Sequence, residues 1–94
     1  DNLLFVAIEK GQVIGAVMAG YDGHRGWLYA VAVDPNERRN GIGRKLVDHA
    51  VLSLKDLGCI KINLQVRSSN AKVVAFYRNL GFKSEERISM GKKI

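Results

Sequence analysis

Two glycines separated by one residue lie among basic residues, where an apolar segment gives way to one with helical spacing. The apolar segment 27–33 leads through Asp-Pro into the run Arg38-Arg39-Asn40-Gly41-Ile42-Gly43-Arg44. The first turn of a helix carries backbone N–H groups without intrahelical partners, at the positive end of the helix dipole. Because glycine has no Cβ, an anion can come close to the main chain at such a place. The sequence therefore predicts that residues 38–44 bind a diphosphate.

Two common phosphate-binding motifs do not describe this loop. A dinucleotide-binding turn needs a third, small residue where Leu46 stands, and a P-loop needs Gly-Lys-Ser/Thr, which is absent. A tight strand-to-helix turn without any ligand would use the same two glycines. The glycines alone leave the diphosphate and the bare turn open.

A second segment separates these alternatives. Residues 70–82 read Asn-Ala-Lys-Val-Val-Ala-Phe-Tyr-Arg-Asn-Leu-Gly-Phe. Together with Arg38-x-x-Gly41-x-Gly43, this segment resembles the GNAT superfamily of acyl-CoA-dependent N-acyltransferases, and the resemblance covers nearly the whole chain. Residues 21–26 are similar to an uncharacterised bacterial subgroup, and residues 65–70 to protein N-terminal acetyltransferases. The resemblance implies an α/β (α+β) fold with a mixed central sheet, splayed parallel strands and two helices.

The resemblance also implies a site for acetyl-CoA as co-substrate. The pantetheine arm would pair with the backbone of the central strand, and the pyrophosphate would lie on N–H groups of the loop. Asn70 matches an asparagine that contacts the cofactor. The expected cofactor-binding residues are Val31, Ala32, Val33, Arg38, Arg39, Asn40, Gly41, Ile42, Gly43, Arg44 and Asn70. No metal is expected.

Acyl transfer from a thioester to an amine needs a polarised carbonyl, a neutral amine and a proton for the leaving thiolate. Tyr77 matches the family's general acid, although a core aromatic residue would also fit that position. No carboxylate lies on segment 27–33, so the candidates for a general base are Asp22, His24 or water. The resemblance thus implies one catalytic residue, Tyr77, and leaves the base open.

Composition excludes several other classes of protein. The 94 residues are 47% apolar, which predicts a single domain over 1–94. A single cysteine, Cys59, excludes an internal disulfide and fits a reducing compartment such as the bacterial cytoplasm. No apolar run approaches the ~18 residues of a membrane span. The net charge is +6, and most of the basic residues are scattered along the sequence, which argues against a nucleic-acid-binding surface. The basic residues that cluster around 38–45 would attract the phosphates of CoA.

Hydrophobic periodicity gives the order of the elements. Strands are expected at 3–9, 12–19, 27–33 and 60–66, with a hairpin turn at Lys10-Gly11. Segment 27–33 should be central in the sheet, because it is apolar on both faces. One helix should run from Gly41 to Gly58 and another from Asn70 to Gly81, followed by short strands at 82–84 and 88–93. The expected inward stripe of the first helix is Ile42, Leu46, Val47, Ala50, Val51, Leu54 and Leu57.

Family members begin with a strand and two helices that this chain lacks, so an N-terminally incomplete domain is expected. Its strand 3–9 should then have an open edge, and the chain should form a homodimer or belong to a longer protein. The predicted function is N-acetyl transfer from acetyl-CoA to a primary amine of unknown identity, by direct attack in a ternary complex. The alternatives are a non-catalytic acyl-CoA-binding module and, more distantly, a basic nucleic-acid-binding domain.

Overall fold

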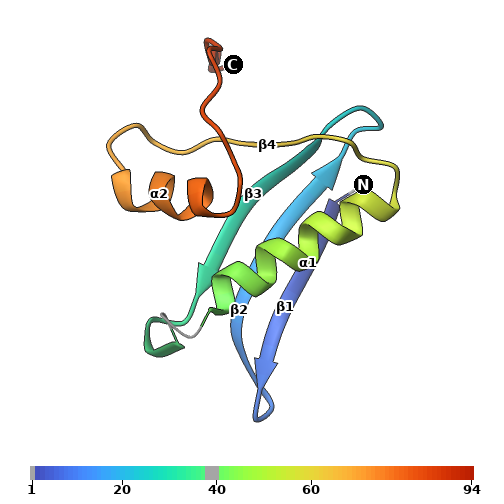
Figure 1. The fold of residues 1–94 in the computed structure, drawn as a ribbon, viewed down its shortest axis with the longest axis vertical. Helices are drawn as coiled ribbons and strands as arrows, with labels where there is room; N and C mark the ends of the chain where they lie inside the picture. The colour runs from blue at the N-terminus through green and yellow to red at the C-terminus, as the bar shows by residue number, and fades with distance from the viewer. Residues whose placement is uncertain (1, 38–40) are drawn as a thin grey trace.

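A computed structural model describes residues 2–37 and 41–94 of the chain. Its sheet has the order β1-β2-β3-β4, and α1 lies across one face (Figure 1). The first three strands are antiparallel, and β4 pairs with β3 in parallel, so β3 is an interior strand as predicted. The elements are β1 (Asn2–Glu9), β2 (Gln12–Tyr21), β3 (Gly26–Val33), a 3₁₀ turn at Pro35–Glu37, α1 (Ile42–Asp56), β4 (Ile62–Leu64) and α2 (Ala71–Asn79).

Local sequence signals set the ends of most elements, and they confirm the predicted turns and caps. Lys10 and Gly11 both have positive φ, 51° and 77°, as the tight β1–β2 hairpin requires. Past the end of α1, Gly58 has a φ of 97°, and the N–H of Cys59 returns to the carbonyl of Leu54 at 3.1 Å. Gly81 ends α2 in the same way. These left-handed glycines satisfy carbonyl groups that the helix ends would otherwise leave bare.

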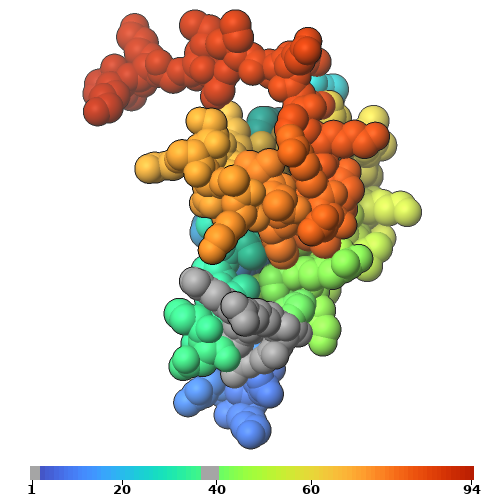
Figure 2. All heavy atoms as spheres, turned by 60° about the vertical axis from the view of Figure 1, so that its left-hand side comes forward, coloured from blue at the N-terminus to red at the C-terminus, as the bar shows by residue number. Residues whose placement is uncertain are grey.

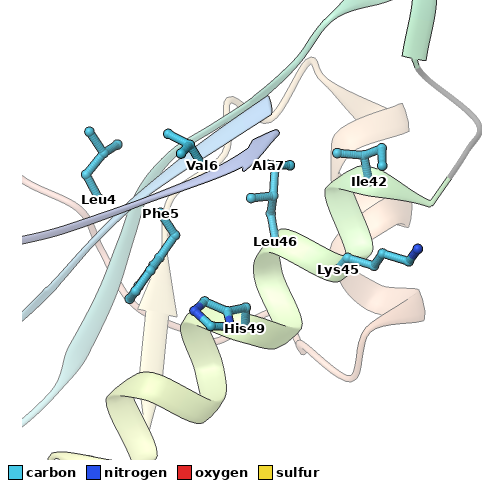
Figure 3. A pocket seen from close by; sticks show the side chains of 8 residues that line it. All are labelled: Leu4, Phe5, Val6, Ala7, Ile42, Lys45, Leu46 and His49. Carbon is cyan, nitrogen blue, oxygen red and sulfur yellow. The ribbon is translucent and has the colours of Figure 1, made fainter. Parts of the chain in front are cut away.

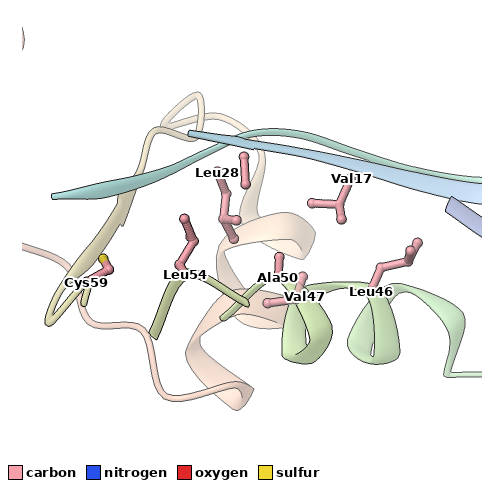
Figure 4. Close-up of a cluster of buried hydrophobic side chains, with 8 residues drawn as sticks. Val17, Leu28, Leu46, Val47, Ala50, Leu54 and Cys59 are labelled. Atoms are coloured by element: carbon pink, nitrogen blue, oxygen red, sulfur yellow. The ribbon is translucent and has the colours of Figure 1, made fainter. Parts of the chain in front are cut away.

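The hydrophobic core fills the space between the sheet and α1 (Figure 4). Gly15 on β2 permits this close packing, because a Cβ there would stand 2.9 Å from Cδ1 of Leu46. The predicted stripe of α1 is largely confirmed, but Leu57 is wrong: it caps the helix and is 52% exposed. The fully or nearly buried members of the core are Val17, Ala19, Leu28, Leu46, Val47, Ala50, Leu54 and Cys59.

Two predicted strands near the C-terminus do not form. Residues 82–84 and 88–93 belong to no strand, and β4 is shorter than predicted. Side-chain hydrogen bonds rather than a backbone ladder join this segment to the β4 region, for example Gln65 Nε2 to Ser89 Oγ at 2.9 Å. Ile88 and Met90 are 88% and 90% exposed, so these alternating apolar side chains pack against no other apolar surface among the described residues. The end of the chain extends away from the body of the molecule (Figure 2).

The face of the sheet opposite α1 is apolar and exposed. Leu4 and Ile8 on β1 are each 64% accessible, and β1 is the edge of the sheet. Beside this edge, β1 and α1 enclose a hollow of about 360 Å³ that includes Lys45 and His49 (Figure 3). The open edge predicted for this strand is therefore present.

In the described part of the chain, neither helix is long and apolar enough to cross a bilayer.

Candidate active site

The parallel strands β3 and β4 separate after three residue pairs. The register pairs Gly26 with Ile62, Trp27 with Asn63 and Leu28 with Leu64, and β3 then continues to Val33 without β4 beside it. On its other side β3 remains paired with β2. Backbone polar groups along the far part of β3 thus face an opening instead of a neighbouring strand. This separation confirms the splayed strands predicted for the fold.

Three of the expected cofactor-binding residues lie on this unpaired part of β3. Val31 and Val33 are half-buried and pack against the core, whereas Ala32 is exposed. Their backbone groups, which any residue type would provide, are the feature relevant to binding. The sequence placed these residues on a central strand but could not show where β4 leaves it.

A β-bulge marks the point of separation. Ala19 pairs with Leu28 and Met18 pairs with Ala30, so Tyr29 is an extra residue in β3. Its side chain is 60% exposed. A bulge bends a strand and increases its twist locally, which re-aims the backbone that follows. The bulge therefore directs the unpaired part of β3 away from the line of β4.

The N-terminus of α1 is open. Its N-cap residue, Gly41, is left-handed with a φ of 74° and makes no side-chain capping bond to the first turn. A Cβ on Gly41 would meet none of the described residues within 4 Å. Ile42 begins the helix, and Arg44 is exposed with its Nε 3.8 Å from Oδ2 of Asp48. The first-turn N–H groups are thus available to an outside anion. Arg38, Arg39 and Asn40 lie outside the described residues.

Gly43 has a second reason to be glycine. A Cβ at this position would stand 3.3 Å from Cζ of Phe76 on α2 and 3.7 Å from Cγ2 of Val33. The space-filling view shows the start of α1 next to α2 (Figure 2). Glycine here allows the two helices and the end of β3 to meet.

The second helix begins at the predicted cap. Oδ1 of Asn70 accepts a hydrogen bond from the backbone N–H of Val73 at 3.4 Å. The side chain expected to contact the cofactor therefore also fixes the start of α2. This position gives Asn70 a structural role beside the expected one.

Tyr77 lies between two other aromatic rings of the same region. Its ring centroid is 5.1 Å from that of Phe76 and 5.5 Å from that of Phe82, both in edge-to-face geometry. Half-burial raises the pKa of the Tyr77 hydroxyl above its ordinary value. Tyr77 also lines a groove of about 1470 Å³ together with Leu64 and Val66, which lie at the end of β4 and just beyond it. The hydroxyl group is therefore protonated at neutral pH, and Tyr77 lines the same groove as the end of β4.

The two candidates for a general base lie in the exposed loop before β3. The carboxylate of Asp22 accepts hydrogen bonds from the N–H groups of Arg25, at 2.7 Å, and His24, at 2.8 Å. The same two bonds hold the pKa of Asp22 below its ordinary value. Figure 1 places this loop at the end of β3 far from the start of α1. Asp22 thus shapes the turn, and its lowered pKa makes it a weaker base than an unperturbed aspartate.

The groove contains polar residues that the sequence did not single out. Nδ2 of Asn63 donates to Oε1 of Glu85 at 2.8 Å, and Lys61 Nζ bonds to Oε2 of the same carboxylate. Glu85 is 22 residues from Asn63 in sequence, and no local sequence pattern predicts that contact. Only the alternation of polar residues along 61–65 could have drawn attention to Asn63. Among the described residues, no group of three histidine, cysteine, aspartate or glutamate side chains could hold a metal ion.

Comparisons with known proteins find acetyltransferases similar to this chain in sequence and in fold. An acetyltransferase of Pectobacterium atrosepticum is 39% identical over 93 residues, which is 99% of this chain and 66% of that protein. The ribosomal-protein-S18-alanine N-acetyltransferase of Escherichia coli has a TM-score of 0.83 at 32% identity, covering 89% of this chain and 54% of that one.

A more distant solved structure has the same fold. AAC(6')-Iy in complex with the bisubstrate analogue CoA-S-monomethyl-acetylneamine has a TM-score of 0.87 at 20% identity, covering 99% of this chain and 69% of that one. The present chain spans 66% of the length of the Pectobacterium relative. The acetyltransferase (GNAT) family model matches residues 1–82, and the chain belongs to that family.

Proposed function

We propose that this protein is an N-acetyltransferase that moves an acetyl group from acetyl-CoA to a primary amine. The observation that carries the proposal is that the chain presents two backbone surfaces with free hydrogen-bonding groups, one on β3 and one at the start of α1. The unpaired part of β3 begins after Leu28, and the uncapped N-terminus of α1 follows β3 in the chain. A chain of amides, such as pantetheine, fits the strand edge, and a diphosphate fits the helix end.

Each part of acetyl-CoA has a residue group to hold it under this proposal. The backbone of Val31, Ala32 and Val33 pairs with the pantetheine arm. The N–H groups of the loop 38–44 hold the diphosphate, with Arg44 adding positive charge at its end. Asn70, at the start of α2, completes the binding residues. The relative solved with a CoA-containing bisubstrate analogue shares this fold, which supports the choice of ligand.

The chemistry requires a proton donor at the sulfur and a polarised carbonyl. Acetyl-CoA supplies the acetyl group as an activated thioester. We assign the polarising role to N–H groups of β3 near Val33, because they are not used by β4. The amine nitrogen forms the new bond to the carbonyl carbon as the carbon–sulfur bond breaks. Tyr77 gives its proton to the departing thiolate, and the proton of the amine goes to Asp22, His24 or water.

The acceptor is proposed to be an amine of a small molecule or of a protein. The E. coli relative is named for an alanine of ribosomal protein S18, which supports the protein class of acceptor for that enzyme. The single, unpaired Cys59 fits a reducing compartment, and we propose the cytoplasm. The chain is proposed to act as a homodimer without nucleic-acid or membrane partners.

A matched pair of substitutions at Gly41 tests the site of cofactor binding. Asparagine and aspartate both tolerate the left-handed backbone of Gly41 and both cap helices well, and the space around a Cβ there is empty. They differ by one negative charge at the proposed diphosphate. We expect Gly41→Asp to bind acetyl-CoA about 10-fold more weakly than Gly41→Asn in calorimetry at low salt. Equal affinities of the two variants would remove the diphosphate from this loop.

One observation favours a second function, that of an acyl-CoA-binding module without catalysis. The strand Gly26–Val33 carries neither a carboxylate nor an imidazole, and Asp22 is committed to its turn. A module of this kind would bind acetyl-CoA with the same dependence on Gly41. It would release no CoA when amines are added, so product formation separates it from the enzyme.

A further inference from the structure

Trp27 and Asn63 are neighbours across the last pairs that join β3 to β4. They are directly opposite each other in the parallel register, one position before the strands separate. Paired residues project from the same side of a sheet, and here that is the side opposite the buried Leu28. Both side chains line the large groove beside β4. They thus lie next to the opening where the proposed transfer takes place.

The side-chain oxygen of Asn63 lacks a hydrogen-bond donor. Its Nδ2 donates to Oε1 of Glu85 at 2.8 Å, whereas its Oδ1 is buried and has no partner among the described residues. Leaving such an acceptor without a donor is unfavourable, because it has lost its water without gaining a bond. A ligand that donates a hydrogen bond at this point would remove that cost.

Glu85 already holds one ammonium group. Its carboxylate binds Nζ of Lys61, and the two side chains remain 34% and 45% exposed, respectively. The bond from Lys61, followed by the bond from Asn63, lowers the pKa of Glu85, and Arg87 adds a smaller contribution. Glu85 is therefore a carboxylate at neutral pH. The Lys61 side chain shows that an alkylammonium group fits against this carboxylate.

We propose that Trp27, Asn63 and Glu85 form an acceptor subsite that selects molecules carrying a protonated alkylamine in addition to the neutral amine that is acetylated. Glu85 and Oδ1 of Asn63 accept hydrogen bonds from the ammonium group, and the partly exposed indole of Trp27 contacts its carbon chain and adds cation–π attraction. Lys61 occupies the carboxylate when no acceptor is bound and yields it when one arrives. In calling the ligand an acceptor, the inference rests on the proposed transferase function.

A purely structural role makes a different prediction for the same residues. If Glu85 only ties the C-terminal segment to β4, Lys61 and Glu85 are equal partners, and loss of either should have the same effect. If Glu85 binds the acceptor, Lys61 is a competitor. The two roles therefore predict opposite effects for the loss of Lys61.

The test uses the protein with n-butylammonium chloride as probe and n-butanol as its uncharged counterpart, at constant ionic strength. Trp27 is the single tryptophan of the chain, so its fluorescence reports the subsite directly. We expect saturable binding of the ammonium but not the alcohol. Glu85→Gln should weaken this binding by about 10-fold or more, because the bonds to a charged group are lost. Lys61→Met should bind equally or more tightly.

Glu86→Gln is the matched control, since it removes an adjacent exposed carboxylate. It should bind the probe as the parent does. The inference is overturned if Glu85→Gln and Glu86→Gln behave alike, if butanol binds as butylammonium does, or if Lys61→Met weakens binding as Glu85→Gln does. Acetyl-CoA calorimetry on the same variants separates the two proposals. Acetyl-CoA binding without Glu85-dependent ammonium binding refutes the subsite alone. Glu85-dependent ammonium binding by a parent that does not bind acetyl-CoA refutes the cofactor site alone.

Discussion

Gly43 at the start of α1 lies against Phe76 of α2, and a Cβ on Gly43 would stand 3.3 Å from Cζ of that ring. The contact joins the helix that carries the proposed diphosphate site to the helix that carries Tyr77. Phe76 in turn packs edge-to-face on Tyr77. A change at Gly43 is therefore expected to reach Tyr77 through a single intervening side chain.

Gly43→Val should lower the free energy of unfolding by about 1–3 kcal/mol, because the added methyl groups overpack against the ring. Phe76→Leu in the Gly43→Val background should recover part of the loss, which chemical denaturation of the double-mutant cycle would show. Gly91→Val is the control, since a Cβ there meets nothing within 4 Å. Strict additivity of the two changes would mean that the residues do not compete for space.

Tyr77→Phe should lower turnover by about 100-fold or more with acetyl-CoA affinity little changed, if the hydroxyl protonates the thiolate. Steady-state kinetics and calorimetry measure the two quantities separately. Tyr21→Phe serves as control, because Tyr21 lies near Gly58 at the far end of α1. Turnover of Tyr77→Phe within a few-fold of the parent would make Tyr77 an ordinary aromatic residue of the core.

The raised pKa of Tyr77 also predicts how stability depends on pH. Because the folded state holds the proton more tightly than the unfolded chain, the unfolded chain ionises first as pH rises past about 10. This contribution to stability is fully present below that pH and is lost above it. The thermal midpoint of the parent should thus fall more steeply above about pH 10 than that of Tyr77→Phe. Parallel curves for the two proteins would contradict burial of the hydroxyl.

The exposed face and edge of β1 predict self-association. Leu4 and Ile8 are each 64% exposed on an edge strand, a combination that favours pairing with a second copy. Light scattering should show a dimer for the parent and a monomer for Leu4→Glu with Ile8→Glu. Leu52→Glu changes an equally apolar residue, 60% exposed on α1, and should leave the dimer intact. A parent that scatters as a monomer at all concentrations would refute the dimer.

Features encoded by neighbouring residues were predictable from the sequence. Lys10-Gly11, Asn70, Gly58 and Gly81 each specify a turn or cap through their own backbone preferences, and the structure confirms all four. The apolar stripe of α1 was also predictable, because helical spacing fixes which side chains share a face. Its one error, Leu57, lies where the helix has already ended.

Features that depend on distant contacts were not predictable. Alternation at Ile88 and Met90 indicated a strand, but a strand also needs a partner, and no described strand pairs with this segment. Gly43 and Phe76 meet through the packing of two helices, which spacing alone does not show. The contact of Lys61 with Glu85 spans 24 residues and depends on the path of the C-terminal segment. The proposed acceptor subsite is therefore visible only in three dimensions.

The most direct test of the central claim is to mix the protein with acetyl-CoA and a panel of primary amines. Release of CoA thiol and the mass of each amine are then followed together. If the protein transfers acetyl groups, CoA release depends on the amine, and the amine gains one acetyl group in equal amount. Both signals should be strongly reduced in Tyr77→Phe. Tight binding of acetyl-CoA without amine-dependent release or acetylated product for any amine would contradict acetyl transfer and identify the chain as a binding module.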